Sequence, residues 1–451
     1  MTTHLPGQAT AREADWPASL VESARVHRDV YTSESVFALE QQRLFRRSWL
    51  YLGHDSQLPA PGDFLALTLA GQPMLVLRQP DGEIIALENR CLHKGTPLVT
   101  VASGNAGRML RCAYHGWSYR HDGRLLAIPL REGYAGTPFA ADAQCPPRLM
   151  RFESLRNYRG FLFIRLAPQG LSLEQWFGPA LAALDNMADR SPAGRLEVVG
   201  RPLQHRIACN WKIYLENIND AMHPVSAHRS AAATAQRLWR AQPPDTAKPM
   251  AIEQMLPFGS DYEFFNGMGA RILPNGHSFF GTRFNIHSAY AALDDYTRAM
   301  HASHGEAATR AILGFQSQNT VLYPSVSVKG SPLAIRVLRP VSAAETVLES
   351  WAFHAIDAPD HLLERALTYN RVAFSPMSVV AHDDVHLFEA IQRNLLADSN
   401  PWVALQREGA NPEALAGESR YEQEVSSGSE ALMRNQFKAW AHRMGEQDPP
   451  A

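Results

Sequence analysis

Four residues in the first half of the chain have the types and the order of a metal site. A cysteine and a histidine stand at Cys91 and His93, and after 18 intervening residues the same pair recurs at Cys112 and His115. Two thiolates and two imidazoles can hold one tetrahedral zinc ion. They can equally hold a 2Fe–2S cluster in which two histidines replace two cysteines on one iron. The residue types alone leave both metals open.

The spacing of these four residues favours the iron–sulfur cluster. Structural zinc sites use C-x(2–4)-C and H-x(3–5)-H spacings, whereas here each loop supplies one cysteine and one histidine. That arrangement suits a dinuclear cluster with Cys91 and Cys112 on one iron and His93 and His115 on the other. A glycine follows each pair and can bring backbone N–H groups close to the sulfides.

A second group of candidate ligands follows about a hundred residues later. Asp220, His223 and His228 have the spacing D-x-x-H-x4-H. Mononuclear non-haem iron that activates dioxygen is held by two histidines and one carboxylate on one face. Residues five apart lie about 140° around an ideal helix, so the histidines converge only if the helix is broken, and Pro224 permits a break. Asp220 is either the carboxylate ligand or a residue that fixes the tautomer of His223.

A pair of acids after an apolar run is the other source of a carboxylate. Asp383 and Asp384 follow the segment 374–381 and precede a helical pattern. Acids at the start of a helix are also common caps, so a solvated helix N-terminus is the alternative interpretation of this pair.

The elements around these residues divide the chain into two parts. Residues 59–166 form short β-like runs separated by turn signals, and the runs on either side of Asp81-Gly82 predict a hairpin. From Ser172 onward helical and strand patterns alternate over longer elements. The sequence therefore predicts a small all-β domain followed by a larger α+β domain. A helix is predicted over residues 36–52, and a surface helix over residues 426–444.

Composition excludes several classes of function. The net charge of -2 argues against a nucleic-acid-binding protein, which would show a basic bias. No apolar run approaches the roughly 20 residues needed to cross a bilayer, so no membrane partner is expected. Four cysteines in 451 residues do not make a disulfide framework. We expect a cytoplasmic protein.

Three separated segments resemble, in the same order, the α subunits of Rieske non-haem iron aromatic-ring-hydroxylating oxygenases. They read CLH…CAYHGWSY at 91–119, NWKIYLENINDAMHPVSAH at 210–228 and FSPMSVVAHDDVHLFE at 374–389. The resemblance runs from about residue 36 to the C-terminus. It implies an α+β fold, with a small all-β Rieske domain and a larger α+β catalytic domain that has a central antiparallel sheet of the helix-grip type. The expected domains are residues 51–168 for the cluster and 169–451 for catalysis, with the tail and helix of residues 1–50 belonging to the catalytic domain.

The resemblance also implies a role for each candidate ligand. By likeness of motif, Cys91, His93, Cys112 and His115 bind the cluster, and His223, His228 and Asp384 bind the catalytic iron. Asp220 matches the aspartate that links a cluster histidine of one subunit to an iron histidine of its neighbour. The gap between the cluster loops is slightly longer than is usual, and His382 replaces an acidic or polar residue before the aspartate pair. Neither departure removes a ligand.

Electrons must come from another protein. The chain has no G-x-G-x-x-G turn and so no evident nicotinamide or flavin site. The resemblance implies that electrons from NADH arrive through a ferredoxin or a reductase. It also implies that the substrates are dioxygen and a small aromatic molecule, and that the chain forms an α3 ring or an α3β3 assembly with a small β subunit.

Within the family, the segment 210–223 and the C-terminal helix look closest to enzymes that act on aromatic carboxylic acids such as terephthalate or salicylate. Such a substrate would meet an arginine, and Arg336 and Arg283 are the candidates. Candidate apolar walls of the pocket are Phe374, Met377 and Val380. The expected reaction is cis-dihydroxylation or hydroxylation. The alternatives are a Rieske monooxygenase or demethylase acting on another substrate class, a pure electron carrier, and a zinc-stabilised binding protein without enzymatic activity.

Overall fold

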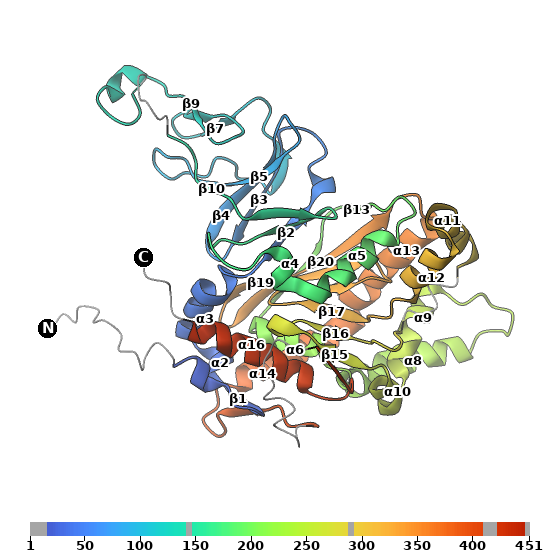
Figure 1. Ribbon diagram of the computed structural model, residues 1–451. Helices are drawn as coiled ribbons and strands as arrows, with labels where there is room; N and C mark the ends of the chain where they lie inside the picture. The colour runs from blue at the N-terminus through green and yellow to red at the C-terminus, as the bar shows by residue number, and fades with distance from the viewer. Residues whose placement is uncertain (1–15, 141–146, 287–292, 409–421, 447–451) are drawn as a thin grey trace. The chain divides into compact units, whose positions relative to one another are not determined.

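The computed structural model describes residues 16–140, 147–286, 293–408 and 422–446. The chain divides into two compact units, Phe45–Gly170 and the combination of Met1–Leu44 with Leu171–Ala451. Residues 1–15, part of the predicted segment 1–50, lie outside the described residues. Figure 1 labels the elements of both units.

The unit Phe45–Gly170, here called the cluster unit, is built from short antiparallel strands in its described residues. Five strands pair in the order β10-β5-β4-β3-β6, and two further sheets have the orders β11-β12-β2 and β7-β8-β9. The strands are β2 (Leu50–His54), β3 (Asp63–Leu69), β4 (Gln72–Arg78), β5 (Ile84–Glu88), β6 (Ser103–Asn105), β7 (Leu110–Arg111), β8 (Ser118–Tyr119), β9 (Leu125–Ala127), β10 (Arg151–Phe152), β11 (Leu155–Tyr158) and β12 (Phe161–Ile164). The predicted hairpin at Asp81-Gly82 is confirmed, because β4 and β5 pair across it.

The other unit, here called the catalytic unit, is organised by a nine-stranded antiparallel sheet among its described residues. Its order is β13-β20-β19-β18-β17-β16-β15-β22, and β14 also pairs with β20. The strands are β13 (Leu196–Val198), β14 (Leu203–Ile207), β15 (Ala270–Ile272), β16 (Ser278–Phe280), β17 (Asn319–Leu322), β18 (Val326–Lys329), β19 (Ala334–Ser342), β20 (Glu345–Ala355) and β22 (Gln423–Val425). A separate pair joins β1 (Arg25–His27) to β21 (Trp402–Ala404).

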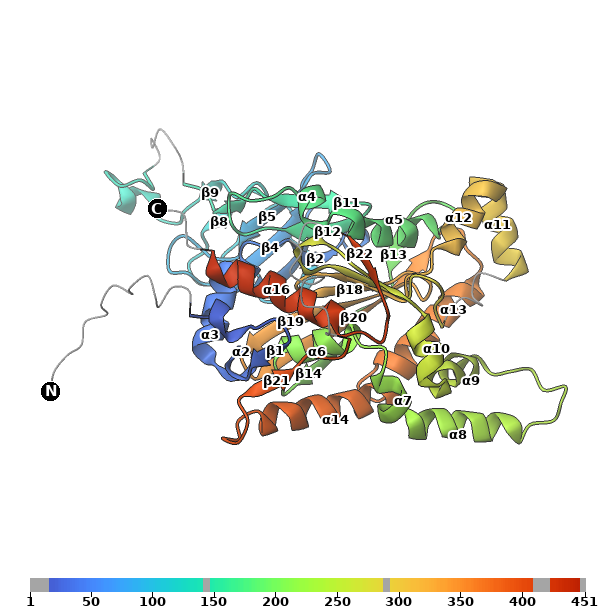
Figure 2. The same ribbon diagram turned by 60° about the horizontal axis from the view of Figure 1, so that its bottom comes forward.

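Helices cover both faces of this sheet. In Figure 2 the strands lie between α4 and α5 on one side and α6, α7 and α14 on the other. The helices are α2 (Asp29–Thr32), α3 (Glu34–Glu40), α4 (Leu173–Phe177), α5 (Ala182–Asp189), α6 (Trp211–Ile218), α7 (His223–Ala227), α8 (Arg229–Arg240), α9 (Met250–Met255), α10 (Tyr262–Gly267), α11 (Asp294–His304), α12 (Glu306–Gly314), α13 (Asp360–Tyr369), α14 (Val379–Asn394) and α16 (Ala431–Gly445). The predicted fold class, an all-β domain plus an α+β domain with an antiparallel sheet, is confirmed.

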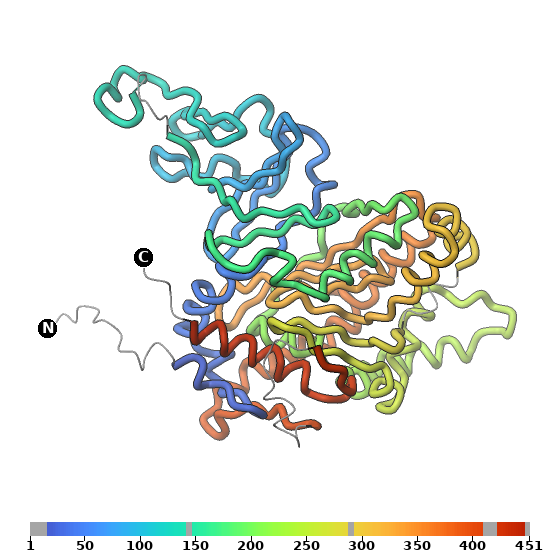
Figure 3. The backbone as a smooth tube through the Cα atoms, in the orientation of Figure 1, coloured from blue at the N-terminus to red at the C-terminus, as the bar shows by residue number. Residues whose placement is uncertain are grey.

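Two helix predictions were wrong in part. The helix predicted over residues 36–52 ends at Phe45, and Leu50–His54 forms β2 because it pairs with β12. The predicted surface helix near the C-terminus is α16, and it is buried along most of its length. Figure 3 shows this red helix lying against the blue N-terminal segment of the same unit. The sequence pattern missed this burial because polar side chains of α16, such as Asn435 and Gln436, are themselves buried.

A buried ionic network holds three helices of the catalytic unit together. Glu40 at the end of α3 accepts hydrogen bonds from Lys212 Nζ at 2.6 Å and from Trp211 Nε1 at 2.9 Å, both on α6. Trp440 Nε1 of α16 donates to the same carboxylate at 2.6 Å. Glu40 is 0% exposed and Lys212 is 1% exposed, so neither charge has water to stabilise it. This network fixes α6, which leads directly into the second group of candidate ligands.

No helix in the described ranges is long and apolar enough to span a membrane.

Candidate metal centres and the adjoining cavity

The two loops that carry the first four candidate ligands have the same backbone hydrogen bonds. Gly95 N–H donates to the carbonyl of Cys91 at 2.9 Å, and Gly116 N–H donates to the carbonyl of Cys112 at 3.1 Å. Both glycines have positive φ, 77° and 72°, which an L side chain rarely adopts. The amide of each cysteine in turn donates to a carbonyl five residues on. Two equivalent turns therefore present one cysteine and one histidine each.

The side chains of these loops lie together. The rings of His93 and His115 are 4.5 Å apart between centroids, and His93 stacks on Trp117 at 4.8 Å with an angle of 3° between the planes. Cys91 and Cys112 are buried, while both histidines are more exposed. The Tyr119 hydroxyl lies 3.1 Å from Cys91 Sγ. The cysteine end of the site is thus enclosed by protein, and the histidine end faces outward.

This donor set fits a Rieske cluster. Cys91 and Cys112 are free thiols, and His93 Nδ1 is buried without a hydrogen-bond partner. A buried imidazole nitrogen without a partner is costly unless another group uses its lone pair. Two thiolates at the buried end and two imidazoles at the outer end match the asymmetric ligands of such a cluster.

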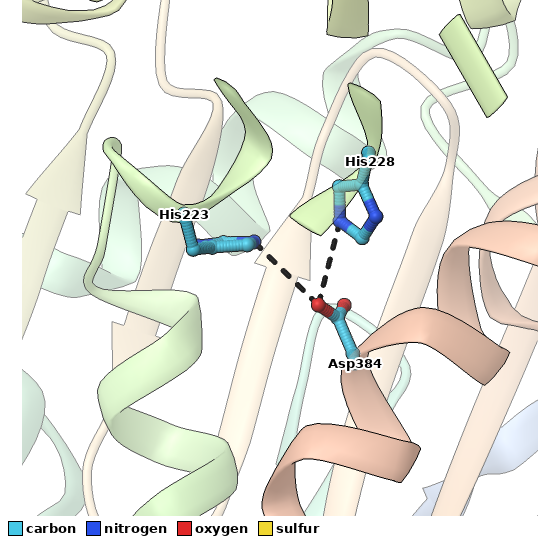
Figure 4. A group of neighbouring side chains, drawn as sticks. All are labelled: His223, His228 and Asp384. Carbon is cyan, nitrogen blue, oxygen red and sulfur yellow. Dashed lines mark ion pairs between the residues drawn. The ribbon is translucent and has the colours of Figure 1, made fainter. Parts of the chain in front are cut away.

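The second group converges on a point between α7 and α14. His223 Nε2 lies 3.8 Å from Asp384 Oδ1, and His228 Nε2 lies 3.4 Å from the same oxygen. One ligand atom from each of these three residues lies within 4.8 Å of the other two. Figure 4 shows both imidazoles directed at the Asp384 carboxylate. Because the two imidazole rings are nearly perpendicular, at 83°, they approach this point from different directions.

Two further carboxylates lie behind the imidazoles. Asp220 Oδ2 is 3.5 Å from His223 Nδ1, and Asp383 Oδ2 is 3.4 Å from His228 Nδ1. Each histidine therefore has a carboxylate on its Nδ1 side and leaves Nε2 for the shared point. A carboxylate in this position fixes the tautomer of a metal-binding histidine and raises the basicity of the nitrogen that binds the metal.

Local structure explains how closely spaced histidines come to converge. Asp220 accepts hydrogen bonds from the backbone N–H groups of Met222 at 2.9 Å and His223 at 3.2 Å, which forms the turn before α7. The helix α7 ends at Ala227, and His228 has non-helical φ and ψ of -98° and 12°. The break between α7 and α8 turns His228 toward His223. The third residue arrives from α14, which begins at Val379 with Ser378 as its N-cap.

Burial and neighbouring charges shift the pKa values of three residues at this site. Burial, together with the neighbouring His223, lowers the pKa of His228 to about 4, although Asp383 opposes this shift. Burial alone would raise the pKa of Asp220, but its bonds to His223 and Met222 and the charge of Arg407 outweigh burial and lower it. Burial raises the pKa of Asp384, against the effects of His223 and Arg336. A divalent cation at the shared point would stabilise the ionised form of Asp384.

These three residues fit mononuclear iron. Two imidazoles and one carboxylate that meet on one side of a point form the donor set of non-haem iron sites with open positions. Asn217 Nδ2 of α6 donates to Asp384 Oδ1 at 3.3 Å, which restrains the carboxylate.

A cavity adjoins the three residues. Phe374, Val380 and Arg336 line it, as predicted from the sequence. The prediction that Met377 forms a wall was wrong, because Met377 lies in the turn before α14 and is 92% exposed. Arg283 is also exposed and is not part of the lining, so it is not the arginine of this pocket.

Several residues of the site were not found from the sequence. Asp383 was considered only as an alternative ligand, and its position behind His228 follows from the pitch of α14. Arg407, which donates to Asp220 Oδ1 at 3.1 Å, comes from a distant loop with no motif around it. Lys329 also lines the cavity, yet it reads in the sequence as an ordinary end of an apolar strand. Among these residues, only the adjacent pair Asp383 and Asp384 could be recognised from the sequence as candidate ligands.

A β-domain with a cluster-type donor set, joined in one chain to a mononuclear iron site, defines the class of Rieske-type oxygenases. Comparison with known families agrees. Residues 48–152 match the Rieske [2Fe-2S] domain, and residues 194–446 match the catalytic domain of the ring hydroxylating alpha subunit. The second match spans more than half of the chain, so the chain belongs to the family of ring-hydroxylating alpha subunits.

Relatives and solved structures extend this result. The 2-halobenzoate 1,2-dioxygenase large subunit of Burkholderia cepacia is 28% identical over 388 residues, which cover 85% of this chain and 80% of that protein. Toluate 1,2-dioxygenase subunit alpha of Pseudomonas putida is 28% identical over 465 residues, with 98% and 96% covered. The crystal structure of naphthalene 1,2-dioxygenase from Rhodococcus sp. bound to indole has a TM-score of 0.74 at 22% identity and covers 98% of both chains, so this likeness concerns the fold.

The chain is therefore the α subunit of a ring-hydroxylating terminal oxygenase, an oxidoreductase whose cofactors are a Rieske 2Fe–2S cluster and a mononuclear non-haem iron. Members of this family receive electrons from ferredoxins or reductases, typically from NADH, and form multimeric assemblies.

Proposed function

We propose that the chain inserts oxygen from O2 into an aromatic carboxylic acid, by cis-dihydroxylation or hydroxylation. The observation that carries this substrate class is the buried guanidinium of Arg336 in the lining of the cavity. Named relatives with the family fold act on related acids, since two of them are the 2-halobenzoate and toluate dioxygenases.

Among the described residues, the surroundings of Arg336 compensate its charge only weakly, through an electrostatic interaction with Asp384 that is not an ion pair. Its side chain is 7% exposed and donates to three neutral oxygens, Tyr214 Oη at 3.2 Å, Asn319 Oδ1 at 3.0 Å and Ser327 Oγ at 3.3 Å. Within the described ranges it forms no ion pair. A buried cation without a counter-ion is strongly unfavourable, whereas a carboxylate offers it charge-assisted hydrogen bonds. A substrate carboxylate would supply the missing negative charge.

We assign the metal ligands from the geometry of the two candidate metal centres. Cys91, Cys112, His93 and His115 hold the cluster, and His223, His228 and Asp384 hold the iron. When bound, the cluster supplies electrons one at a time and the iron supplies the activation of dioxygen. The chain's own contribution is to orient both imidazoles through Asp220 and Asp383, so that each Nε2 faces the shared point, and to restrain Asp384 through Asn217. In this proposal residues 51–168 form the cluster domain, and 169–451 with 1–50 form the catalytic domain.

Asp220 is proposed as the residue through which electrons reach the iron site from a neighbouring subunit in an α3 or α3β3 assembly. Its side chain is 17% exposed and borders an open hollow lined also by Met222, Tyr262 and Arg407. One side of Asp220 therefore faces His223, and its other side faces solvent. Loss of the carboxylate behind His223 weakens iron binding, so the Asp220→Ala variant is assayed with iron in excess, where its iron and sulfide contents should stay near those of the wild type while turnover stops. Normal turnover would rule out this role, and analytical ultracentrifugation would test the assembly.

The substrate class is tested with the purified chain, a generic reductase, NADH, ¹⁸O-labelled oxygen and a panel of aromatic acids and uncharged arenes, read by mass spectrometry. Two labelled atoms in an acid product would establish dioxygenation, and one would establish hydroxylation or demethylation. In the variant Arg336→Met, turnover of the acids should fall far more than turnover of any uncharged arene. Products formed only from uncharged arenes would contradict the proposal.

A further inference from the structure

A second buried basic side chain lines the same cavity. Lys329 is the last residue of β18, and its side chain is only 4% exposed. Its Nζ lies 5.3 Å from the ring centroid of Tyr369 and 5.9 Å from that of Phe374. No carboxylate in the described part of the chain pairs with it. The amine therefore lies in the cavity wall beside groups that would compensate a positive charge only weakly.

Lys329 and Arg336 are placed together by the register of the sheet. Lys329 pairs with Ala334, and Arg336 pairs with Ser327, so the two cations are diagonal neighbours on the same face of β18 and β19. Diagonal neighbours in a sheet are about 7–8 Å apart, within reach of long side chains. Both also approach one ring, because the guanidinium carbon of Arg336 lies 4.5 Å from the centroid of Phe374. The sheet thus directs two positive groups to one region of the cavity wall.

Fold stability does not explain this arrangement. Burial, and secondarily the charge of Arg336, lowers the pKa of Lys329 well below its ordinary value, which shows that the cavity disfavours a second positive charge. An apolar side chain of similar size would pack between Tyr369 and Phe374 without that cost. A stability cost of this kind is often found where a group serves ligand binding.

We propose that Lys329 is a substrate-specificity residue, and that its amine and the guanidinium of Arg336 together bind the acid group of the substrate. The inference rests on the proposed function, since it needs an anionic substrate. One carboxylate has two oxygens and can accept hydrogen bonds from both cations at once. Its negative charge removes the repulsion between them, which no uncharged analogue can do. The pair therefore selects acids over neutral molecules of the same shape.

The test compares binding of acids and of their amides to the intact, metal-loaded protein by isothermal titration calorimetry. The probes are 3-methylbenzoate and 2-chlorobenzoate, each with the corresponding benzamide as its uncharged match. In the variant Lys329→Met, we expect about 10- to 100-fold weaker binding of both acids, which is the usual cost of losing a hydrogen bond to a charged group. Binding of the amides should change little, so the preference for acid over amide falls by the same factor.

Two controls keep a structural effect apart from a binding effect. Lys248, which is exposed and lies 5.0 Å from the ring centroid of Trp239, provides a matched lysine, and Lys248→Met should leave every affinity unchanged. Lys329→Met should unfold at the same temperature as the wild type or higher, with the visible absorption of the cluster retained. If the methionine variant does not fold, Lys329→Gln is measured instead, because it keeps a polar head without the charge.

The outcomes separate this inference from the proposed function. Acids that bind to the wild type and to Lys329→Met equally, but not to Arg336→Met, would overturn the role of Lys329 and leave the aromatic-acid proposal standing. Equal losses for acids and amides in Lys329→Met would mean that Lys329 only shapes the cavity, and would also overturn the role. If neither acid binds to the wild type, the proposed substrate class is wrong and the inference fails with it.

Discussion

The two metal centres of this chain are built in different ways. The candidate cluster ligands come from two short loops between Cys91 and His115, and each loop closes itself with its own backbone hydrogen bonds. The candidate iron ligands come from α7, from the break after it and from α14, with His228 and Asp384 far apart in the sequence. The first centre depends mostly on local turns. The second depends on packing of the catalytic unit, and four predictions test this difference.

The largest expected effect is the loss of one metal centre while the other centre is retained. Replacing Asp384→Ala removes the carboxylate shared by both imidazoles, so we expect iron content to fall by about one atom per chain and turnover to become undetectable. Acid-labile sulfide and the cluster's visible absorption should remain. The reverse variant, Cys112→Ser, should lose the cluster and keep the mononuclear iron. Joint loss of both metals in either variant would mean that the centres are not built independently.

The next effect concerns the packing that the catalytic centre needs. In Glu40→Gln the buried Lys212 loses its counter-charge, so the free energy of unfolding of the catalytic unit should fall by about 3–5 kcal/mol. Urea unfolding followed by tryptophan fluorescence measures this, and iron should be lost before the cluster. The exposed ion pair between Arg310 and Glu306 gives the control, and Glu306→Gln should cost under about 1 kcal/mol. Similar losses in the two variants would contradict the role of the network.

Acid should weaken both units in the same pH range. Burial lowers the pKa of His277 in the catalytic unit to about 4, and burial likewise lowers that of His54 in the cluster unit to about 4. The unfolded chain, with a histidine pKa of about 6.5, binds more protons between pH 6.5 and 4, so stability falls as the pH falls through that range. Titration of each histidine should lower the free energy of unfolding by about 3 kcal/mol at pH 4 and should not change it above about pH 7.

Unfolding measured from pH 7.5 to 4.5 checks this prediction. The variant His277→Asn removes the group that titrates, so it should be less stable at pH 7.5 but show a shallower slope below pH 6.5. The loss of stability at pH 7.5 follows from the two bonds of the ring, from Nε2 to the Trp176 carbonyl at 2.8 Å and from Tyr323 N–H to Nδ1 at 2.8 Å. An unchanged slope would show that His277 is not the titrating group.

The smallest effect comes from a residue behind a ligand. Asp383→Asn keeps the size of the side chain but removes the negative charge beside His228 Nδ1, so affinity for iron should fall about 10- to 100-fold. Competition with a chelator measures the change. His386 is exposed one turn further along α14, and His386→Asn should have no effect. An affinity in Asp383→Asn equal to that of the wild type would leave Asp383 without a role in orienting His228.

The sequence alone was informative in proportion to how local each feature is. The cluster motif, the hairpin at Asp81-Gly82 and the spacing of Asp220 and His223 are short-range patterns, and the structure shows each as a turn or a pair of strands. The helix predicted over residues 36–52 failed because β12 recruits residues 50–54 into a sheet, and pairing with a distant strand leaves no trace in helical periodicity. Arg336 and Arg283 were equal candidates until the fold buried one and exposed the other.

The sequence by itself thus determined the chemistry that this protein has at its disposal: the donor types, their order along the chain, and the class of domains that carry them. Only the tertiary structure placed Asp384 at the Nε2 side of both histidines and Asp383 at the Nδ1 side of His228, and placed Lys329 and Arg336 on one face of the sheet. The reason is physical. Turn geometry is set by neighbours in the chain, whereas the meeting of α7, α14, β18 and β19 is set by burial and strand register between segments far apart in sequence.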